Sequence, residues 1–108
     1  MKSTIGEYIH DLRLSHRMTL TQLGALLGID SGALSKIENG KKSLDAKNLP
    51  NLAKAFSLDI HELNKQFMSE KIACEIINNS CDETLLALVA EKIRQLKSKN
   101  IKQSELKF

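Results

Sequence analysis

The segment of residues 20–40, LTQLGALLGIDSGALSKIENG, restricts the fold of this chain more than any other part of it. Apolar residues follow a helical spacing on both sides of Gly28, and glycine is the residue best suited to the left-handed conformation that ends a helix. Thr19 is placed to cap the helix before Gly28, and Asp30 to cap a helix that runs to about Asn39. The segment therefore predicts two short helices joined by a tight turn.

The interior of this helix pair is also defined by residue type. Gly24 is the small residue needed where the second helix of the pair crosses close over the first. Five apolar residues are spaced so that they point between the two helices: Leu23, Leu27, Ile29, Leu34 and Ile37. The spacing of these glycine and apolar residues is the one that two closely crossing helices require, so it indicates such a crossing.

Helices are predicted on both sides of the pair. The spacing of Ile5, Ile9 and Leu12 predicts a helix over about residues 4–15, and Pro50 fits the first turn of a helix that starts near Asn48. No segment alternates polar and apolar residues as a strand does. The fold class is therefore all-α.

Two longer helices are predicted in the second half of the chain. Asp59 is placed to cap a fifth helix that carries Leu63 and Phe67 and continues towards Ile77. Ser80, followed three residues later by Glu83, has the spacing of a capping box ahead of a sixth helix over residues 85–96. We divide the chain into a five-helix domain (residues 1–67), a helical extension (68–98) and a frayed tail (99–108).

Composition restricts the class of protein without giving its function. The net charge of +3 is small, and nine basic against seven acidic residues fall in residues 1–67, so any basic surface must be local. No apolar run approaches the roughly 18 residues of a membrane helix, and Glu7 and Asp11 occupy the place of a signal peptide's apolar core. We expect a cytoplasmic protein without membrane contact.

The residues that carry enzyme and metal chemistry are scattered. Cys74 and Cys81 form no CxxC pair, and we expect Cys74 to be a small core residue and Cys81 to lie at a helix end. His10, His16 and His61 fall on three different segments without neighbouring cysteines or paired carboxylates. The sequence therefore predicts no enzyme, no metal site and no cofactor.

Residues 5–67 resemble the helix-turn-helix domain of the phage repressor and Cro family, also called the xenobiotic-response-element family. The resemblance rests on the segment 20–40, on Arg13, on SKIENGKK (35–42) and on LAKAFSLDIHEL (52–63). It implies that the second helix of the motif lies in the major groove of double-stranded DNA, while the first crosses the phosphate backbone. The alternative is an ordinary corner between two helices that contacts no DNA.

The resemblance also implies roles for single residues. Base contacts fall to Ser31, Gly32, Ser35 and Lys36, and phosphate contacts to Thr19, Thr21, Gln22, Asn39, Lys41 and Lys42. Among these, Lys36 is best suited to donate to guanine, and a solvated surface lysine is its alternative role. Arg13 and Glu38 match the family's buried ion pair. Leu20 stands where the family often has glutamine, and Gly24 where it usually has alanine.

The extension predicts a partner, because its apolar stripes exceed what the small domain needs to close its core. The stripe residues are Phe67, Ile72, Ile76, Leu85, Leu88, Val89, Ile93 and Leu96. A self-complementary helical surface favours a homodimer, which would read a two-fold symmetric operator with half-sites about 34 Å apart. The alternative is that the extension packs on its own domain.

A weaker resemblance concerns the extension itself. SEKIACEI (69–76) and LVAEKIRQLK (88–97) are similar to the tails of controller proteins of restriction-modification systems, which implies a dimeric, autoregulating protein that activates and represses transcription. The predicted helix over residues 20–27 has no acidic residue, so the sequence does not support contact with RNA polymerase. The alternative function is that of an antitoxin or other partner-binding protein. A small-molecule sensor is a third possibility, but the remaining residues leave no room for a ligand-binding domain.

Overall fold

The computed structural model describes residues 3–99, and the regular structure in them is entirely helical. The elements are α1 (Ile5–Ser15), α2 (Leu20–Leu27), α3 (Ser31–Glu38), the 3₁₀-helix η1 (Ala46–Asn48), α4 (Leu49–Phe56), α5 (Ile60–Asn78) and α6 (Leu85–Ser98). The predicted all-α class is confirmed. The six α-helices fall where apolar spacing places them.

Local capping chemistry fixes the beginnings of the first two helices. The Thr4 hydroxyl accepts a hydrogen bond from the Glu7 N–H at 3.2 Å, and the Glu7 carboxylate accepts one from the Thr4 N–H. Thr19 and Gln22 form the same reciprocal pair at the start of α2. Gly28 ends α2 in the left-handed conformation with φ of 71°, as predicted.

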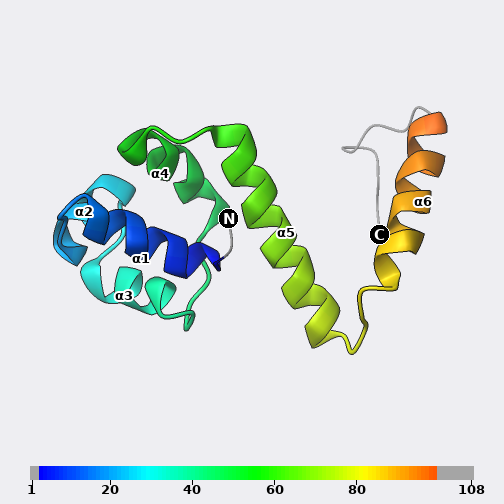
Figure 1. Cartoon of the computed structure of the whole chain (residues 1–108), viewed down its shortest axis with the longest axis horizontal. Coiled ribbons are helices and arrows are strands. Elements are labelled where there is room, and N and C mark those ends of the chain that lie inside the picture. Colours follow the sequence, from blue (N-terminus) through cyan, green and yellow to red (C-terminus); the bar gives the residue numbers. More distant parts are fainter. Residues whose placement is uncertain (1–2, 100–108) are drawn as a thin grey trace. The chain divides into compact units, whose positions relative to one another are not determined.

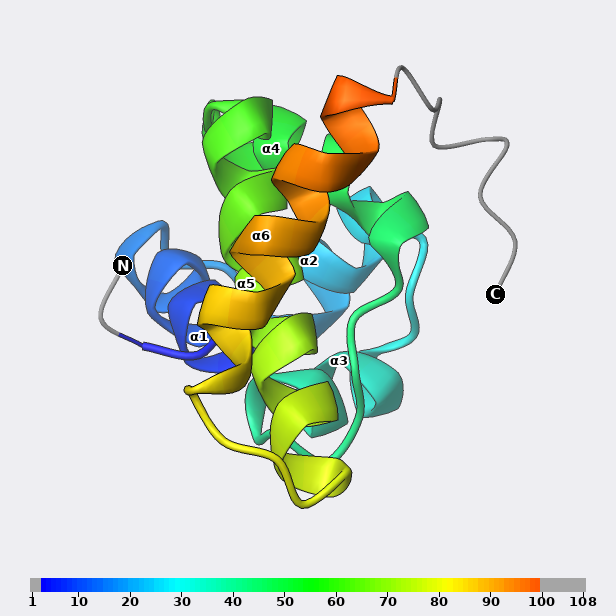
Figure 2. The same ribbon diagram turned by 90° about the vertical axis from the view of Figure 1, so that its right-hand side faces the viewer.

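The chain divides into two compact units within α5, and they are considered separately. We call residues 3–71 the DNA-binding unit, after the role that the sequence resemblance implies, and residues 72–99 the extension unit, from the division after Lys71. Helices α1–α4 lie together in both views of the molecule (Figure 1, Figure 2). The fully buried side chains of the first unit come from four helices: Ile9, Leu23, Leu27, Leu34 and Leu52.

The 3₁₀-helix η1 is an element that the sequence analysis did not predict. It lies in the polar stretch after α3, where the Asp45 carboxylate accepts a hydrogen bond from the Lys47 N–H at 3.0 Å. Leu44, just ahead of it, is 6% exposed and belongs to the core. A single buried leucine thus holds a polar loop against the DNA-binding unit.

The predicted capping box at Ser80 and Glu83 is wrong. Ser80 takes the left-handed conformation, with φ of 58°, where the chain leaves α5, and the next N–H, of Cys81, bonds to the Ile76 carbonyl oxygen. The Asp82 carboxylate instead accepts hydrogen bonds from the N–H and hydroxyl of Thr84, just before α6. Ser80 serves the end of one helix, so it is not available to begin the next.

The expectation that Cys74 is a core residue is also wrong. Cys74 and Cys81 are both free and exposed, and Cys81 lies just beyond the end of α5 as predicted. Cys74 continues the α5 face of Leu63 and Phe67, but it lies beyond Lys71, where the DNA-binding unit ends. Helical spacing places Cys74 on the apolar face of α5, but the contact of that face with the core of the DNA-binding unit ends before Cys74.

Helix α6 ends just before the last described residue. Of the predicted tail, residues 100–108 lie outside the described residues, and Lys99 is the C-cap of α6. Within residues 3–99, no helix has both the length and the apolar character needed to cross a membrane.

Candidate nucleic-acid interface

Helix α3 has one buried side and one open side. Leu34 and Ile37 are 0% and 4% exposed, which fixes the rotation of the helix about its axis. The four residues expected to contact bases are Ser31, Gly32, Ser35 and Lys36, of which Ser35 is half-buried and the others are exposed. The structure therefore places these four residues away from the side of α3 that Leu34 and Ile37 fix in the core.

Both ends of α3 are held by side chains. At its start, Asp30 Oδ1 accepts a hydrogen bond from the Ala33 N–H at 2.8 Å. At its end, Asn39 donates from Nδ2 to the Ser35 carbonyl oxygen at 2.9 Å, which leaves its second amide hydrogen to donate elsewhere. Lys41 and Lys42 follow directly and are exposed, so the expected phosphate contacts beyond α3 lie together.

The beginning of α2 offers hydrogen-bond donors. The capping box satisfies the N–H groups of Thr19 and Gln22, and within residues 3–99 no acceptor is found for those of Leu20 and Thr21. Gln22 accepts through Oε1, so its amide nitrogen remains available to donate. Free N–H groups at a helix start favour an anion, which is the chemistry expected of a phosphate contact.

A buried ion pair connects α1 with α3. Arg13 donates from Nε to Glu38 Oε2 at 2.8 Å and from Nη2 to Oε1 at 3.0 Å, and the two residues are 9% and 8% exposed. Arg13 also donates from Nη1 to the Met18 carbonyl oxygen at 2.9 Å, just before α2. One guanidinium thus links the helix that carries it to both helices of the motif.

His10 completes this cluster and was not foreseen. Its Nδ1 lies 2.7 Å from Glu38 Oε1, and its position three residues before Arg13 on α1 was the available sequence signal. Burial alone would raise the pKa of Glu38, but the hydrogen bonds and charge interactions with Arg13 and His10 together lower this pKa further than burial raises it. The hydrogen bond with Glu38 raises the pKa of Arg13. Both partners are therefore charged at neutral pH.

Two glycines allow close approach of backbones around α3. A Cβ atom at Gly24 would lie 2.4 Å from the Ile29 carbonyl oxygen, so this glycine makes room for the turn rather than for α3 itself. A Cβ atom at Gly6 would lie 2.2 Å from the Ile37 carbonyl oxygen, which sequence reasoning missed. The two positions hold α1, the turn and the end of α3 at fixed distances.

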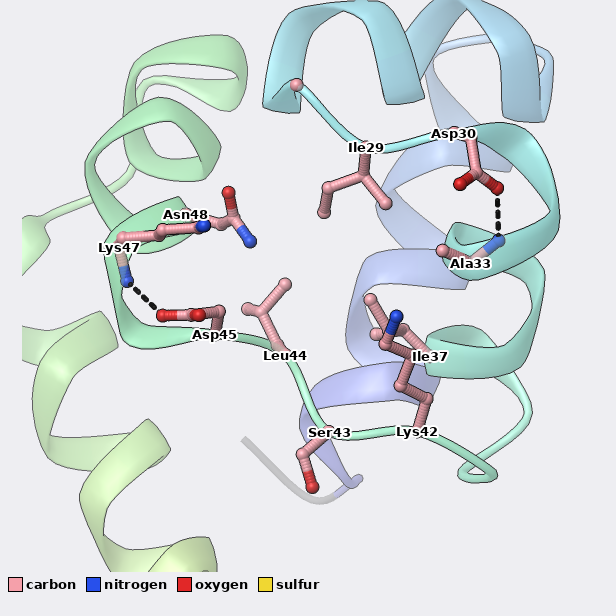
Figure 3. Close-up of a pocket in the computed structure, with 11 residues that line it drawn as sticks. Ile29, Asp30, Ala33, Ile37, Lys42, Ser43, Leu44, Asp45, Lys47 and Asn48 are labelled. Carbon is pink, nitrogen blue, oxygen red and sulfur yellow. Dashed lines mark hydrogen bonds between the residues drawn. The ribbon is translucent and has the colours of Figure 1, made fainter.

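An open pocket of about 490 Å³ lies beside the buried edge of α3 (Figure 3). Its walls include Asp30, Ala33 and Lys42, with Asp45 and Lys47 on the opposite side. Both aspartates already accept backbone hydrogen bonds, drawn as dashed lines in Figure 3. Two lysines and two aspartates balance in charge, so the pocket by itself favours neither anions nor cations.

The expected dimer residues lie partly on each unit. Phe67 is half-buried against the core of the DNA-binding unit. In the extension unit, Ile76, Leu85 and Leu96 are half-buried, whereas Ile72, Leu88, Val89 and Ile93 are 44%, 57%, 38% and 48% exposed. On α5 and α6, three further exposed apolar residues were not among the expected dimer residues: Met68, Ile77 and Leu86.

Comparison with known proteins agrees with this geometry. A family model described as Helix-turn-helix matches residues 9–63. An uncharacterized HTH-type transcriptional regulator of Bacillus subtilis (strain 168), RghRB, is 42% identical over 40 residues, which are 37% of this chain and 29% of that protein. The match thus spans less than a third of the relative's length. No solved structure matches the chain significantly.

The family match contains α2, α3, their turn and the residues of the buried ion pair, and it extends over more than half of the chain. The chain therefore belongs to the helix-turn-helix family, of the Cro and C1 type.

Proposed function

We propose that this protein is a sequence-specific, double-stranded DNA-binding transcriptional regulator that acts as a homodimer and regulates its own gene. The observation that carries the proposal is the two-sided character of α3. Its apolar side is fixed in the core, and its other side presents small polar residues and one lysine to solvent. A helix held in this way can enter the major groove without unfolding its neighbours.

Base readout in this proposal falls mainly to Lys36. Its ammonium group can donate to the O6 and N7 acceptors of guanine, while the hydroxyls of Ser31 and Ser35 donate or accept with less selectivity. Gly32 carries no side chain, so the backbone of α3 can come close to a base pair or to a thymine methyl group there. The specificity of the protein is thus concentrated in one turn of α3.

Phosphate contacts in this proposal flank that turn on both sides. Thr19, Thr21 and Gln22 lie at the start of α2, where free N–H groups favour an anion, and Asn39, Lys41 and Lys42 follow the end of α3. These contacts supply affinity for any sequence and make binding sensitive to salt.

A competition experiment with matched lysine variants tests the proposal. A preferred duplex is selected from random sequences, and affinities for it and for a scrambled duplex are measured by fluorescence anisotropy at two salt concentrations. We expect Lys36→Ala to reduce the preference for the selected duplex by about 10- to 100-fold. Lys41→Ala should weaken binding to both duplexes and lower the salt slope by about one.

Lys54, exposed on α4, is the control, and Lys54→Ala should bind both duplexes as the wild type does. Equal losses for Lys36→Ala on both duplexes would remove Lys36 from base readout. A wild-type protein without preference for any duplex would contradict the proposed function.

The homodimer is supported by the exposed apolar residues of the extension unit, since a single chain leaves Leu88 57% and Ile77 72% exposed. The same residues favour a second candidate function, that of an antitoxin or other protein that binds a different partner. Sedimentation of the purified protein separates the two. A dimer supports the regulator, whereas a monomer that dimerises only poorly at high concentration supports a different partner.

Control of a restriction-modification system is a narrower version of the proposal, and it rests on the resemblance of residues 69–76 and 88–97 to controller tails. Footprinting on DNA upstream of its own gene tests it. Protection of a two-fold symmetric site next to a methyltransferase gene would support this version, and a neighbouring toxin-like gene would favour the antitoxin.

A further inference from the structure

We infer that Glu70 is a positioning residue: it fixes the direction of α5 on the DNA-binding unit and thereby sets which spacing of two half-sites a dimer accepts. This inference rests on the proposed function, because only a dimer has a spacing to select. Glu70 belongs neither to the expected DNA contacts nor to the expected dimer residues.

The first step is the face of α5 that contacts the DNA-binding unit. Ile60, Leu63, Phe67 and Glu70 follow one another at helical spacing, so they share one face. Leu63 is 2% exposed, and Ile60 and Phe67 pack against the same core. The apolar contact therefore holds the first two turns of α5, and Glu70 lies one turn further along.

The second step is the bond that Glu70 makes. Its Oε1 accepts a hydrogen bond from the Ile5 N–H at 2.9 Å, across 65 residues of sequence. Ile5 is the first residue of α1, where N–H groups lack helical partners and the helix dipole favours a negative charge. The capping box already provides acceptors for the N–H groups of Thr4 and Glu7. Glu70 provides the acceptor for the Ile5 N–H, which the capping box leaves without one. Figure 1 shows the beginning of α1 beside α5.

Helix α1 is in turn fixed on α3. Gly6, next to Ile5, lies so close to α3 that a Cβ atom would be 2.2 Å from the Ile37 carbonyl oxygen. Further along α1, Arg13 holds Glu38 of α3 by two hydrogen bonds. Helix α1 therefore has no freedom to slide along α3, so a hydrogen bond to the first residue of α1 also fixes α5 relative to α3.

These contacts give Glu70 a role that its neighbours lack. Among the described residues, it is the last residue of α5 that bonds to another helix, and α5 continues without interruption to Asn78. Without this bond, α5 would be held only over its first two turns and could pivot about them. A pivoting α5 would leave folding and dimerisation intact but would broaden the set of half-site spacings that the dimer accepts.

The test compares operators that differ only in half-site separation. The selected duplex is remade with one or two base pairs added or removed between its half-sites, which rotates one half-site by about 34° per base pair. Affinities are measured for the full-length wild type, Glu70→Ala and Glu70→Gln. Glu70→Gln keeps a carbonyl oxygen that accepts the Ile5 hydrogen bond. Glu62→Ala, which removes an exposed carboxylate from the first turn of α5, is the control.

We expect the wild type, Glu70→Gln and Glu62→Ala to prefer the best spacing over its neighbours by at least about tenfold. Glu70→Ala should bind the best spacing nearly as well but prefer it by only about threefold or less. An unchanged spacing preference for Glu70→Ala would overturn the inference and leave the proposed function standing. A wild-type dimer that accepts all spacings equally would overturn the two-half-site function itself, and the inference with it.

Discussion

The DNA-binding unit and the extension unit are both built from helices with apolar stripes, yet only the first buries them. Every buried side chain among residues 3–99 lies at or before Leu63. In the extension unit, the most exposed large apolar residues are Ile77 at 72% and Leu88 at 57%. The comparison teaches that helical spacing predicts a helix and its apolar side, but not what covers that side.

This difference matches a division of labour. A unit with its own core can hold α3 rigid before DNA arrives, which reduces the ordering cost of binding. In the proposed homodimer, association removes the apolar stripe of the extension unit from water, so we expect the order of that unit to depend on protein concentration.

The largest effect is expected at the buried ion pair of the DNA-binding unit. Glu38→Ala leaves Arg13 buried without its partner and should lower the free energy of unfolding by about 3 kcal/mol. Chemical denaturation monitored by circular dichroism measures this loss. Glu75→Ala, at an exposed carboxylate of the extension unit, should change it by less than about 0.5 kcal/mol. Equal stability of Glu38→Ala and wild type would mean that the pair contributes nothing.

The next effect is expected at the exposed stripe of α6. Ile93→Glu places a charge on both copies of the proposed interface and should raise the dimer dissociation constant about 100-fold, or by about 2.7 kcal/mol. Analytical ultracentrifugation measures the constant. Arg94→Glu, on the side of α6 away from the stripe, is the control for an added negative charge. If Ile93→Glu dimerises like the wild type, another surface joins the copies.

Gly6 provides a third test because α1 and α3 touch there. Gly6→Ala should destabilise the protein by about 2 kcal/mol, since the new methyl group must displace backbone. Gly32→Ala is its matched control, because a Cβ atom there meets only the Asp30 side chain, at 3.3 Å. Thermal melting should therefore separate the two variants. Similar melting temperatures would show that α1 can move away from α3 at little cost.

The pH dependence of stability sharpens the same contrast. The folded-state pKa of Glu38 lies below its unfolded value, so its contribution is full above the unfolded pKa and is lost as the pH falls through the folded one. Stability should therefore decline as the pH falls below about 4.5, because protonation of Glu38 removes its charge interaction with Arg13. Glu38→Gln should flatten this decline. A profile that is unchanged in Glu38→Gln would assign the decline to other carboxylates.

The smallest effect concerns two serines in the left-handed conformation, one in each unit. Ser57 ends α4 with φ of 53°, and Ser80 follows α5 with φ of 58°. Ser57→Gly should stabilise the DNA-binding unit by about 0.5 kcal/mol, because glycine adopts this conformation without strain. Ser80→Gly should leave the melting of that unit unchanged. If Ser80→Gly shifted the melting of the DNA-binding unit and Ser57→Gly did not, the two units would not unfold independently.

The parts of the fold that sequence predicted are those governed by local chemistry. Thr19 caps α2 and Gly28 ends it, as predicted, so these two boundaries needed no tertiary information. Failures arose where a distant or competing contact decides. Ser80 is used to end α5, and Cys74 lies beyond the last turn of α5 that the DNA-binding unit covers.

The candidate site shows the same distinction. The outward position of Ser31 and Lys36 follows from the burial of Leu34 and Ile37, which spacing indicates. The partner of His10 lies 28 residues away, and the only local hint of it is the spacing of His10 from Arg13. The partner of Glu70 lies 65 residues away, and no local pattern marks that contact. The close approach at Gly6 is invisible for the same reason, since it depends on a carbonyl oxygen of another helix.

The DNA-binding unit has a complete core within one chain, and we propose that a second copy completes the extension unit. Hydrogen–deuterium exchange of the full chain, measured over protein concentrations that bracket the dimer dissociation constant, tests it most directly. We predict that protection of α1–α4 is independent of concentration and that protection of α6 rises with it. Protection of α6 that stays the same across that range, whether high or low, would contradict the account.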